Sequence, residues 1–269
     1  MADDRFLLVR LGSLGDIVHA LPAASALRDA YPSAEIDWLV DPKWERILES
    51  NRDLNEVITL DRASIGTIRD TVKNLRARDY SCAIDFQGLY KSALMPFTAR
   101  IPRRIGFPES YAREGLAARF YTERYNPAGA HKVDHNLTLV RAAGARSGAA
   151  RFPLAIFDED QDSASTALAA QNLSDFFVLN PGGGWKSKCW PAERYGELSA
   201  LLAHKHGWRG VVTYGPGEES LAQQALSTAR GTAVAIPLAL GPLMAVFNRA
   251  KFVVSADTGP LHVASALGV

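Results

Sequence analysis

Short apolar runs alternate with helix-length segments over most of this chain, and this alternation restricts the fold more than any other feature. The first runs are residues 6–9, 36–40 and 57–60; a helical pattern at 16–31 follows the first run, and one at 65–78 follows the third. Parallel neighbouring strands need a long crossover, which is usually a helix. The alternation therefore predicts the α/β class, with a doubly wound parallel sheet covered by helices on both faces.

The same alternation starts again in the second half of the chain. Four more apolar runs alternate there with helix-length segments, at residues 176–179, 210–214, 233–235 and 251–255. Each series is long enough to build one sheet between two layers of helices, so two series predict two domains.

The domain boundaries are expected in the irregular stretch between the two series, where Gly148 and Pro153 indicate loops. We predict an N-terminal domain over residues 1–152, a junction with one helix over 153–174, and a C-terminal domain over 175–269. The second series stops at a helix, where another strand would normally cover the sheet edge. We therefore expect the C-terminal domain to be incomplete in this sequence.

The composition fits a globular protein and argues against several other classes. Hydrophobic residues make up 47% and charged residues 22% of the chain, which is ordinary for a packed core. The formal net charge of +1 gives no general attraction to nucleic acid, which is not an expected partner. Cys82 and Cys189 form no CxxC pair, so a reducing, cytoplasmic location is expected. No apolar run approaches the roughly 20 residues of a membrane-spanning helix, so any membrane association is expected to be peripheral.

The loop after the first strand is the first candidate site, because ligands of parallel sheets bind outside the carboxyl ends of the strands. Gly12 and Gly15 allow close backbone approach there. The loop lacks both GxGxxG and the P-loop pattern, which argues against a nicotinamide-dependent oxidoreductase. Asp16 begins the next helix, and His19 follows one turn later. Taken alone, Asp16 fits a helix cap and His19 a packed histidine.

Two loops of the second series carry the matching candidates. Gly182, Gly183 and Gly184 follow a strand and precede Lys186 and Lys188. Exposed backbone N–H groups and positive charge suit a diphosphate, although a flexible surface loop is the alternative.

The last predicted helix begins among polar residues that suit a sugar phosphate. Asp257, Thr258 and Gly259 precede its first turn, and His262 lies within it. A helix start directs free N–H groups and the positive end of its dipole at such a ligand. Simple capping by Asp257 or Thr258 is the alternative. Glu218, in the loop between these two sites, could accept hydrogen bonds from ribose or merely open a helix.

Four segments of the chain resemble one family. Residues 12–22 resemble the N-terminal signature of glycosyltransferase family 9, and residues 252–262 resemble its donor-binding signature. Residues 85–92 resemble a segment of the type I heptosyltransferases in that family. Residues 188–191 resemble the lysine and Trp-Pro pair of the same enzymes. The four segments stand in the expected order, which is far more specific than any one of them.

This resemblance implies a GT-B fold, in which two Rossmann-like domains face a cleft. It implies an inverting, metal-independent transferase without a cofactor, which moves heptose from ADP-heptose to an anionic Kdo–lipid A acceptor in lipopolysaccharide inner-core synthesis. The enzyme is then expected at the cytoplasmic face of the inner membrane. Open alternatives are a type II enzyme, a family member using another sugar, and a non-catalytic protein that binds sugar nucleotides.

The resemblance also implies a role for individual residues. Asp16 corresponds to the general base. The residues that correspond to donor contacts are Ser13, Gly183, Gly184, Lys188, Glu218, Leu238, Asp257, Thr258, Gly259 and His262. The residues that correspond to contacts with the anionic acceptor are Arg10, Lys91 and Arg113. The chain departs from the family at Gly183 and Gly184, where hydroxyl side chains are expected, so backbone N–H groups would have to bind the phosphates.

Two further patterns have competing interpretations. An arginine-rich stretch is predicted to bind the acidic acceptor, and the aromatic residues between its arginines are predicted to lie at a membrane interface. The alternative is a solvated basic face whose aromatic residues belong to the core. Its members are Arg100, Arg103, Arg104, Arg113, Arg119 and Arg124, with Tyr111, Phe120, Tyr121 and Tyr125. Asp158, Glu159 and Asp160 match the letters of an Asp-x-Asp metal site, but acids in a first helical turn complement the helix dipole, which is the preferred interpretation.

Overall fold

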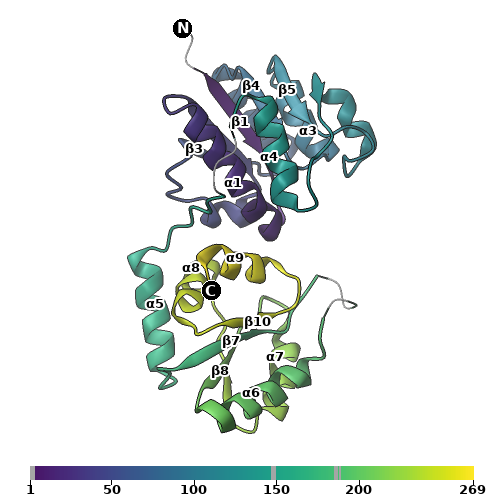
Figure 1. Cartoon of the computed structure of the whole chain (residues 1–269). Coiled ribbons are helices and arrows are strands. Elements are labelled where there is room, and N and C mark those ends of the chain that lie inside the picture. The colour runs from purple at the N-terminus through teal and green to yellow at the C-terminus, as the bar shows by residue number, and fades with distance from the viewer. Residues whose placement is uncertain (1–3, 147–149, 185–186, 188) are drawn as a thin grey trace. The chain divides into compact units, whose positions relative to one another are not determined.

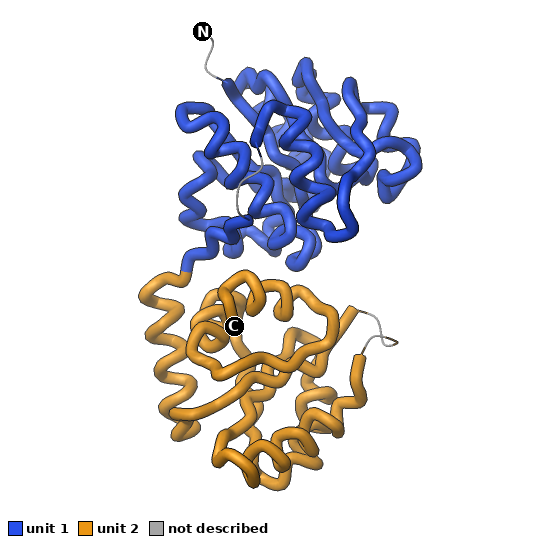
Figure 2. Tube along the Cα trace, in the orientation of Figure 1, with its two compact units in different colours: residues 1–155 blue, residues 156–269 orange. Residues whose placement is uncertain are grey.

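The computed structural model describes residues 4–146, 150–184, 187 and 189–269. The chain forms two compact units, residues 1–155 and residues 156–269 (Figure 2). Each unit holds its own parallel sheet with helices packed on it. The prediction of an α/β fold with two parallel sheets is confirmed.

The sheet of unit 1 changes direction at its middle. Its strands are β1 (Arg5–Val9), β2 (Glu35–Val40), β3 (Glu56–Thr59), β4 (Cys82–Asp85), β5 (Arg103–Gly106) and β6 (Glu123–Arg124). They pair in parallel in the order β3-β2-β1-β4-β5-β6. The chain builds outward from β1 to β3 and then returns to the other side of β1. The order therefore reverses between β1 and β4, which is the Rossmann arrangement.

Helices cover both faces of this sheet. They are α1 (Leu14–Ala30), α2 (Ile65–Ala77), α3 (Tyr90–Thr98) and α4 (Lys132–Ala142), with 3-10 helices η1 (Pro42–Ile47) and η2 (Gly115–Phe120). α1 and α4 lie side by side (Figure 1). Leu7 and Val9 pack with residues of α2 and α3. Alternate strand residues point to opposite faces, so both faces of β1 are buried.

Unit 2 repeats the plan with fewer strands. It contains β7 (Phe176–Asn180), β8 (Arg209–Val212), β9 (Ala233–Ala235) and β10 (Val253–Ser255), in the parallel order β10-β7-β8-β9. Its helices are α5 (Asp158–Ala169), α6 (Ala192–His206), α7 (Glu219–Thr228), α8 (Leu240–Arg249) and α9 (Gly259–Leu267). α6 and α7 pack on one apolar cluster of the sheet, while α8 packs against α5 and α9 (Figure 1). Here the strand order reverses between β7 and β10.

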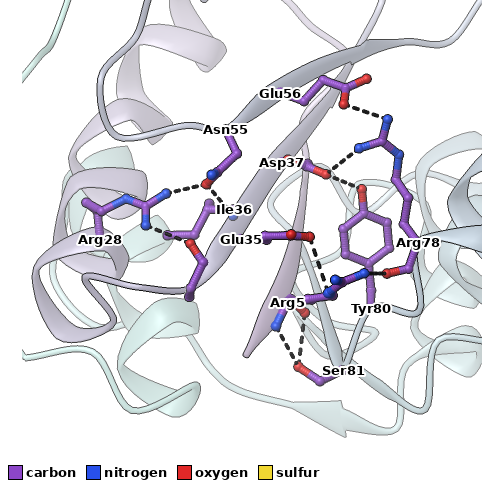
Figure 3. Close-up of polar contacts among 11 residues, drawn as sticks. Arg5, Arg28, Glu35, Ile36, Asp37, Asn55, Glu56, Arg78, Tyr80 and Ser81 are labelled. Carbon is purple, nitrogen blue, oxygen red and sulfur yellow. Dashed lines mark hydrogen bonds and ion pairs between the residues drawn. The ribbon is translucent and has the colours of Figure 1, made fainter. Parts of the chain in front are cut away.

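Ion pairs and hydrogen bonds close the amino edge of the unit 1 sheet (Figure 3). Asp37 on β2 is buried, and its Oδ2 accepts hydrogen bonds from Arg78 at 3.0 Å and Tyr80 at 2.6 Å. Arg78 also pairs with Glu56, at 2.5 Å. Burial raises the pKa of Asp37, and burial together with the Asp37 hydrogen bond raises the pKa of Tyr80. Nearby, Arg28 donates to Asn55 Oδ1 at 2.5 Å, which ties α1 to the start of β3.

Candidate active site

The carboxyl ends of β1 and β4 form the reversal point of the unit 1 sheet, where ligands of doubly wound sheets bind. Side chains join the two loops that leave these strands. Arg10 donates from Nη1 to the carbonyl oxygen of Phe86 at 2.5 Å. Gln87 Oε1 accepts from the backbone N–H of Leu11 at 2.7 Å. The loop that leads into α1 and Asp16 is therefore fixed to the loop that leads into α3.

Asp16 lies in the first turn of α1, and its described contacts converge on one carboxylate oxygen. Oδ2 receives Arg10 Nη2 at 2.5 Å, Ser13 Oγ at 3.0 Å and the Ser13 N–H at 3.2 Å. Oδ1 accepts no hydrogen bond from the part of the chain that the structure describes. The side chain is 28% exposed. The carboxylate is thus held at one oxygen and remains reachable at the other.

The surroundings of Asp16 keep it ionised. Burial by itself raises the pKa of Asp16, but the charge of Arg10 and the hydrogen bonds from Arg10 and Ser13 outweigh it. The pKa of Asp16 therefore lies below its ordinary value of 3.8. At neutral pH the group is a carboxylate that can accept a proton.

Gly12 in this loop and His19 in α1 have packing roles. A Cβ on Gly12 would stand 2.8 Å from Trp44 Nε1, so glycine is needed for the approach of η1. The carbonyl oxygen of His19 accepts a hydrogen bond from Asn136 at 3.0 Å. The ring of His19 meets the ring of His131 edge-on, with centroids 5.2 Å apart. His19 thus belongs to the contact between α1 and the start of α4.

Asp85, at the carboxyl end of β4, is a buried anchor that the sequence analysis did not assign a role. Its Oδ1 accepts the N–H of Gln87 at 2.8 Å, and its Oδ2 accepts Ser92 Oγ at 2.7 Å and Tyr121 OH at 2.7 Å. Burial raises the pKa of Asp85 despite these donors. The sequence signal that could have identified Asp85 is an acidic residue at the end of a buried strand. Asp85 positions the loop that carries Gln87 and the start of α3.

The structure brings Lys91 and Arg113 to the same place. Gly88 has a φ of +66°, and a Cβ there would stand 3.1 Å from the backbone nitrogen of Arg113. The Glu114 N–H donates to Gly88 O at 2.9 Å, while the Glu114 carboxylate accepts the Tyr90 N–H at 2.6 Å. Arg113 therefore lies beside the first turn of α3, which carries Lys91. Both cations are exposed and have no partner among the described residues.

Several members of the arginine-rich stretch have internal partners instead. Arg103 binds Glu123 at 2.6 Å, and Arg104 donates to the carbonyl oxygen of Phe120 at 2.7 Å. Tyr121 is only 3% exposed, because its hydroxyl reaches Asp85. The prediction that Arg103 and Arg104 are available to an acidic acceptor, and that Tyr121 lies at a membrane interface, is wrong. The Arg103–Glu123 ion pair joins β5 to β6, the last strand on this side of the sheet.

Arg10 also has a different environment from the one expected of an acceptor contact. It is 9% exposed, and its guanidinium lies on Asp16 and on the carbonyl oxygen of Phe86. These contacts are those of a residue that positions the Asp16 carboxylate and keeps it ionised.

The reversal point of unit 2 brings the glycine loop against the start of α9. A Cβ on Gly183 would stand 2.6 Å from Cys189 Sγ and 3.4 Å from Thr258 Cγ2. Thr258, the residue before α9, exchanges a hydrogen bond with Ser255 at 3.1 Å and makes no side-chain cap. Gly259 is the first residue of α9. Backbone groups of the loop and of the helix start therefore share one edge of the sheet.

Glu218, Asp257 and His262 lie on this carboxyl edge as well. A Cβ on Gly182 would collide with the Glu218 carboxylate, which accepts the Gly215 N–H at 2.8 Å. His262 Nε2 lies 3.4 Å from Asp257 Oδ1, and the Asp257 side chain is 54% exposed.

The remaining predicted donor contacts differ in what surrounds them. A Cβ on Gly184 would meet no atom of the described residues within 4 Å. Leu238 is half-buried in the loop between β9 and α8. Lys188 lies outside the described residues.

Metal and membrane features are few in the described ranges. Among those residues, no three His, Cys, Asp or Glu side chains gather as a metal site would require. Asp160 is buried in the first turn of α5 and accepts the Phe157 N–H at 3.3 Å, as a capping acid does. None of the described helices combines the length and apolar character needed to cross a membrane.

Comparison with known proteins assigns the chain to a family. The family model described as glycosyltransferase family 9 (heptosyltransferase) matches residues 68–269, well over half of the chain. This chain belongs to glycosyltransferase family 9. Lipopolysaccharide heptosyltransferase 1 of Pseudomonas aeruginosa is 31% identical, over 98% of this chain and 76% of that protein.

Two solved structures of one Escherichia coli enzyme agree with the assignment. Heptosyltransferase WaaC with ADP matches at a TM-score of 0.79 and 29% identity, over 98% of this chain and 84% of that one. The same enzyme with ADP-2-deoxy-2-fluoro heptose matches at 0.78 and 27%, over 98% and 86%. The family 9 protein described here is therefore a glycosyltransferase with the GT-B fold. The oxidoreductase alternative is excluded.

Proposed function

We propose that this family 9 enzyme transfers heptose from ADP-heptose to a Kdo–lipid A type acceptor, with inversion and without a metal, at the cytoplasmic face of the inner membrane. The relatives named above are lipopolysaccharide heptosyltransferases, and the E. coli enzyme binds ADP and an ADP-heptose analogue. The proposal extends those substrates to this chain.

The observation that carries the proposal is the state of Asp16. A base must be ionised and must have a free oxygen directed at its substrate. Arg10 and Ser13 hold Oδ2 and lower the pKa of Asp16, while Oδ1 has no partner in the described part of the chain. A lowered pKa makes the carboxylate a weaker base, but it also guarantees that the group is deprotonated at neutral pH.

The proposed step is a single displacement. The acceptor hydroxyl oxygen forms a bond to the anomeric carbon of heptose, while its proton moves to Asp16 Oδ1. The bond between that carbon and the diphosphate oxygen breaks, and ADP leaves with the electron pair. Attack on the face opposite the leaving group inverts the anomeric configuration.

The leaving diphosphate is proposed to bind at the reversal point of unit 2. The start of α9 at Thr258 and Gly259 presents backbone N–H groups and a positive dipole end. Open backbone at Gly184 and the charge of Lys188 complete this proposed cradle. Charge that develops on the diphosphate is stabilised by donors already in place. We assign Glu218 to the ribose, Leu238 to the adenine, and Ser13, Asp257 and His262 to the heptose end of the donor.

The acceptor is proposed to bind at the first turn of α3. Lys91 and Arg113 are exposed there and are unpaired within the described ranges, which suits the carboxylates and phosphates of Kdo–lipid A. A type II enzyme would instead require an acceptor that already carries heptose.

The test is ADP release from ADP-heptose with two acceptors, Kdo–lipid A and its heptosylated product. Transfer to the first alone supports the type I assignment, and transfer to the second alone replaces it with type II. The anomeric configuration of the product is read by NMR. Activity that persists in EDTA supports the metal-independent mechanism, whereas activity restored only by a divalent cation refutes it. ADP binding without any transfer would support the non-catalytic alternative.

A further inference from the structure

One side of α3 exposes large apolar side chains that no described element covers. Tyr90, Leu94 and Phe97 are spaced at i, i+4 and i+7, so they share a helix face. They are 38%, 36% and 45% exposed. We name these three residues, together with Leu116 and Phe120 of η2, the α3 apolar face.

The members of the α3 apolar face form a contiguous surface. The ring of Phe120 meets Phe97 at a centroid distance of 5.1 Å and Tyr90 at 6.4 Å. Leu116, four residues before Phe120 in η2, is 42% exposed. Beneath them, Ala93 of α3 packs on Ala117 and Ala118 of η2. The base of the patch is therefore a fixed core contact, and only its outer side chains are free to meet something else.

Positive charge surrounds this face. Residues 90–124 contain seven lysines and arginines and three glutamates, a net charge of +4, whereas the whole chain has +1. Arg104 stacks on Phe97, with its guanidinium 5.5 Å from the ring centre. Arg100 and Arg119 are exposed and have no side-chain partner in the described ranges. An apolar surface with a basic rim matches the interior and the headgroups of an anionic lipid leaflet.

We propose that the α3 apolar face docks this enzyme on an anionic phospholipid bilayer, with Leu94 and Phe97 inserted at the headgroup boundary and Arg100 and Arg119 against the headgroups. The choice of a membrane rests on the proposed function, since that acceptor carries its sugar on lipid chains. Lys91 lies in the first turn of the same helix, and Arg113 lies beside that turn. The acceptor headgroup would therefore reach these cations while its acyl chains stay in the bilayer.

The test is co-sedimentation of the full chain with vesicles, without ADP-heptose or acceptor. Vesicles of phosphatidylethanolamine with about 30% phosphatidylglycerol provide the anionic surface, and pure phosphatidylcholine provides the neutral one. Wild-type protein should bind the anionic vesicles and should release in about 0.5 M salt, which screens the headgroups. Leu94→Gln/Phe97→Gln should reduce binding at least about tenfold, because glutamine preserves the helix while removing apolar area.

A matched control variant distinguishes binding through the α3 apolar face from nonspecific binding of exposed apolar side chains to vesicles. Leu201 of α6 is 60% exposed and lies in the other unit, so Leu201→Gln should bind vesicles as wild type does. Arg100→Asn/Arg119→Gln should weaken binding to anionic vesicles several-fold. Unchanged ADP affinity and melting temperature show that each variant is folded.

Two results would overturn the proposal. One is equal vesicle binding by wild type and Leu94→Gln/Phe97→Gln. The other is wild-type protein that ignores vesicles but dimerises in light scattering, with the dimer lost in the same variant; the face would then bind a second copy. Since the assay contains no sugar donor or acceptor, failed transfer activity and failed docking are separate outcomes.

Discussion

Two arginine–aspartate pairs stand at opposite edges of the unit 1 sheet, and their environments differ in ways that separate structure from chemistry. At the amino edge, the Asp37 side chain is 2% exposed and contacts Arg78 and the hydroxyl of Tyr80 (Figure 3). At the carboxyl edge, the Asp16 side chain is 28% exposed and contacts Arg10. Burial dominates the first site and raises its pKa, while the arginine and Ser13 dominate the second and lower its pKa.

The comparison shows that an ion pair alone does not identify a functional acid. The Asp37 pair joins β2 to the chain entering β4 and leaves little of the carboxylate accessible. The Asp16 pair keeps a carboxylate charged while one of its oxygens has no partner in the described chain. Accessibility at the carboxyl end of the strands, together with charge, distinguishes the catalytic candidate.

The largest expected difference between the two acids is in turnover. Asp16→Asn keeps the shape of the side chain but cannot take a proton, so kcat should fall by about 10²–10⁴. Asp37→Asn is the matched control, and its kcat should stay within a few-fold of wild type. Steady-state ADP release measures both. Equal losses in the two variants would mean that Asp16 has no special role in turnover.

The same two positions should differ in the opposite sense in stability. Asp37→Ala leaves the buried hydroxyl of Tyr80 without its acceptor, at a cost of about 1–3 kcal/mol. A lower melting temperature of the unit 1 transition, by about 2–4 °C per kcal/mol, is expected in calorimetry. Asp16→Ala removes a half-exposed side chain and should shift this transition less. A larger drop in melting temperature for Asp16→Ala than for Asp37→Ala would mean that Asp16, not Asp37, contributes more to stability.

The pH dependence of stability should also separate the acids. Because the folded pKa of Asp37 is raised above 3.8, the native state binds the extra proton, and its contribution falls as pH rises from 3.8 through the folded pKa. The folded pKa of Asp16 is lowered, so its contribution is present above 3.8 and is lost as pH falls through the folded value. Asp37→Asn should therefore flatten the stability profile above pH 3.8, and Asp16→Asn only below it. Calorimetry over this range measures both.

Arg10→Met tests whether the arginine sets the charge of the proposed base. Arg10 supplies both the charge and a hydrogen bond that lower the pKa of Asp16 against burial, so the pKa of Asp16 should be higher in the variant than in wild type. The variant should lose kcat/KM on the acid side at a higher pH than wild type does, because its Asp16 takes up a proton more readily. Superimposable profiles would mean that Arg10 has no such role.

The smallest expected effect concerns the donor loop of unit 2. Gly183→Ala would press a Cβ against Cys189, at a cost of about 1–3 kcal/mol, and should weaken ADP binding by about tenfold. The Cβ of Gly184→Ala would meet no atom within 4 Å in the described part of the chain, so this variant should bind ADP as wild type does. Calorimetric titration with ADP compares the two. Equal affinities would separate this loop from the donor site.

The sequence predicted the sheets well because each central strand is a short apolar run between turn residues. It missed β5 (Arg103–Gly106) and β6 (Glu123–Arg124), since these two short strands contain charged residues and have no apolar run. The Arg103–Glu123 ion pair joins the two strands, and periodicity does not encode such a pair.

The sequence predicted where the residues of the candidate site lie, but not which side chains contact one another there. Asp16, the glycine loop and Thr258 follow strands, so their place at the carboxyl edges came from topology alone. The contacts of Arg10 with Phe86, and of Tyr121 with Asp85, join residues 76 and 36 positions apart. Such pairs depend on which strands become neighbours, and the strand order was not available from the sequence.

The central claim is that Asp16 takes the acceptor proton, and the most direct measurement is the chemical step itself. With Asp16→Asn enzyme in excess over ADP-heptose and a saturating lipid acceptor, rapid-quench single turnover removes substrate binding and product release from the rate. The account predicts a rate lower by about 10²–10⁴ with ADP affinity unchanged. A single-turnover rate within a few-fold of wild type would contradict it.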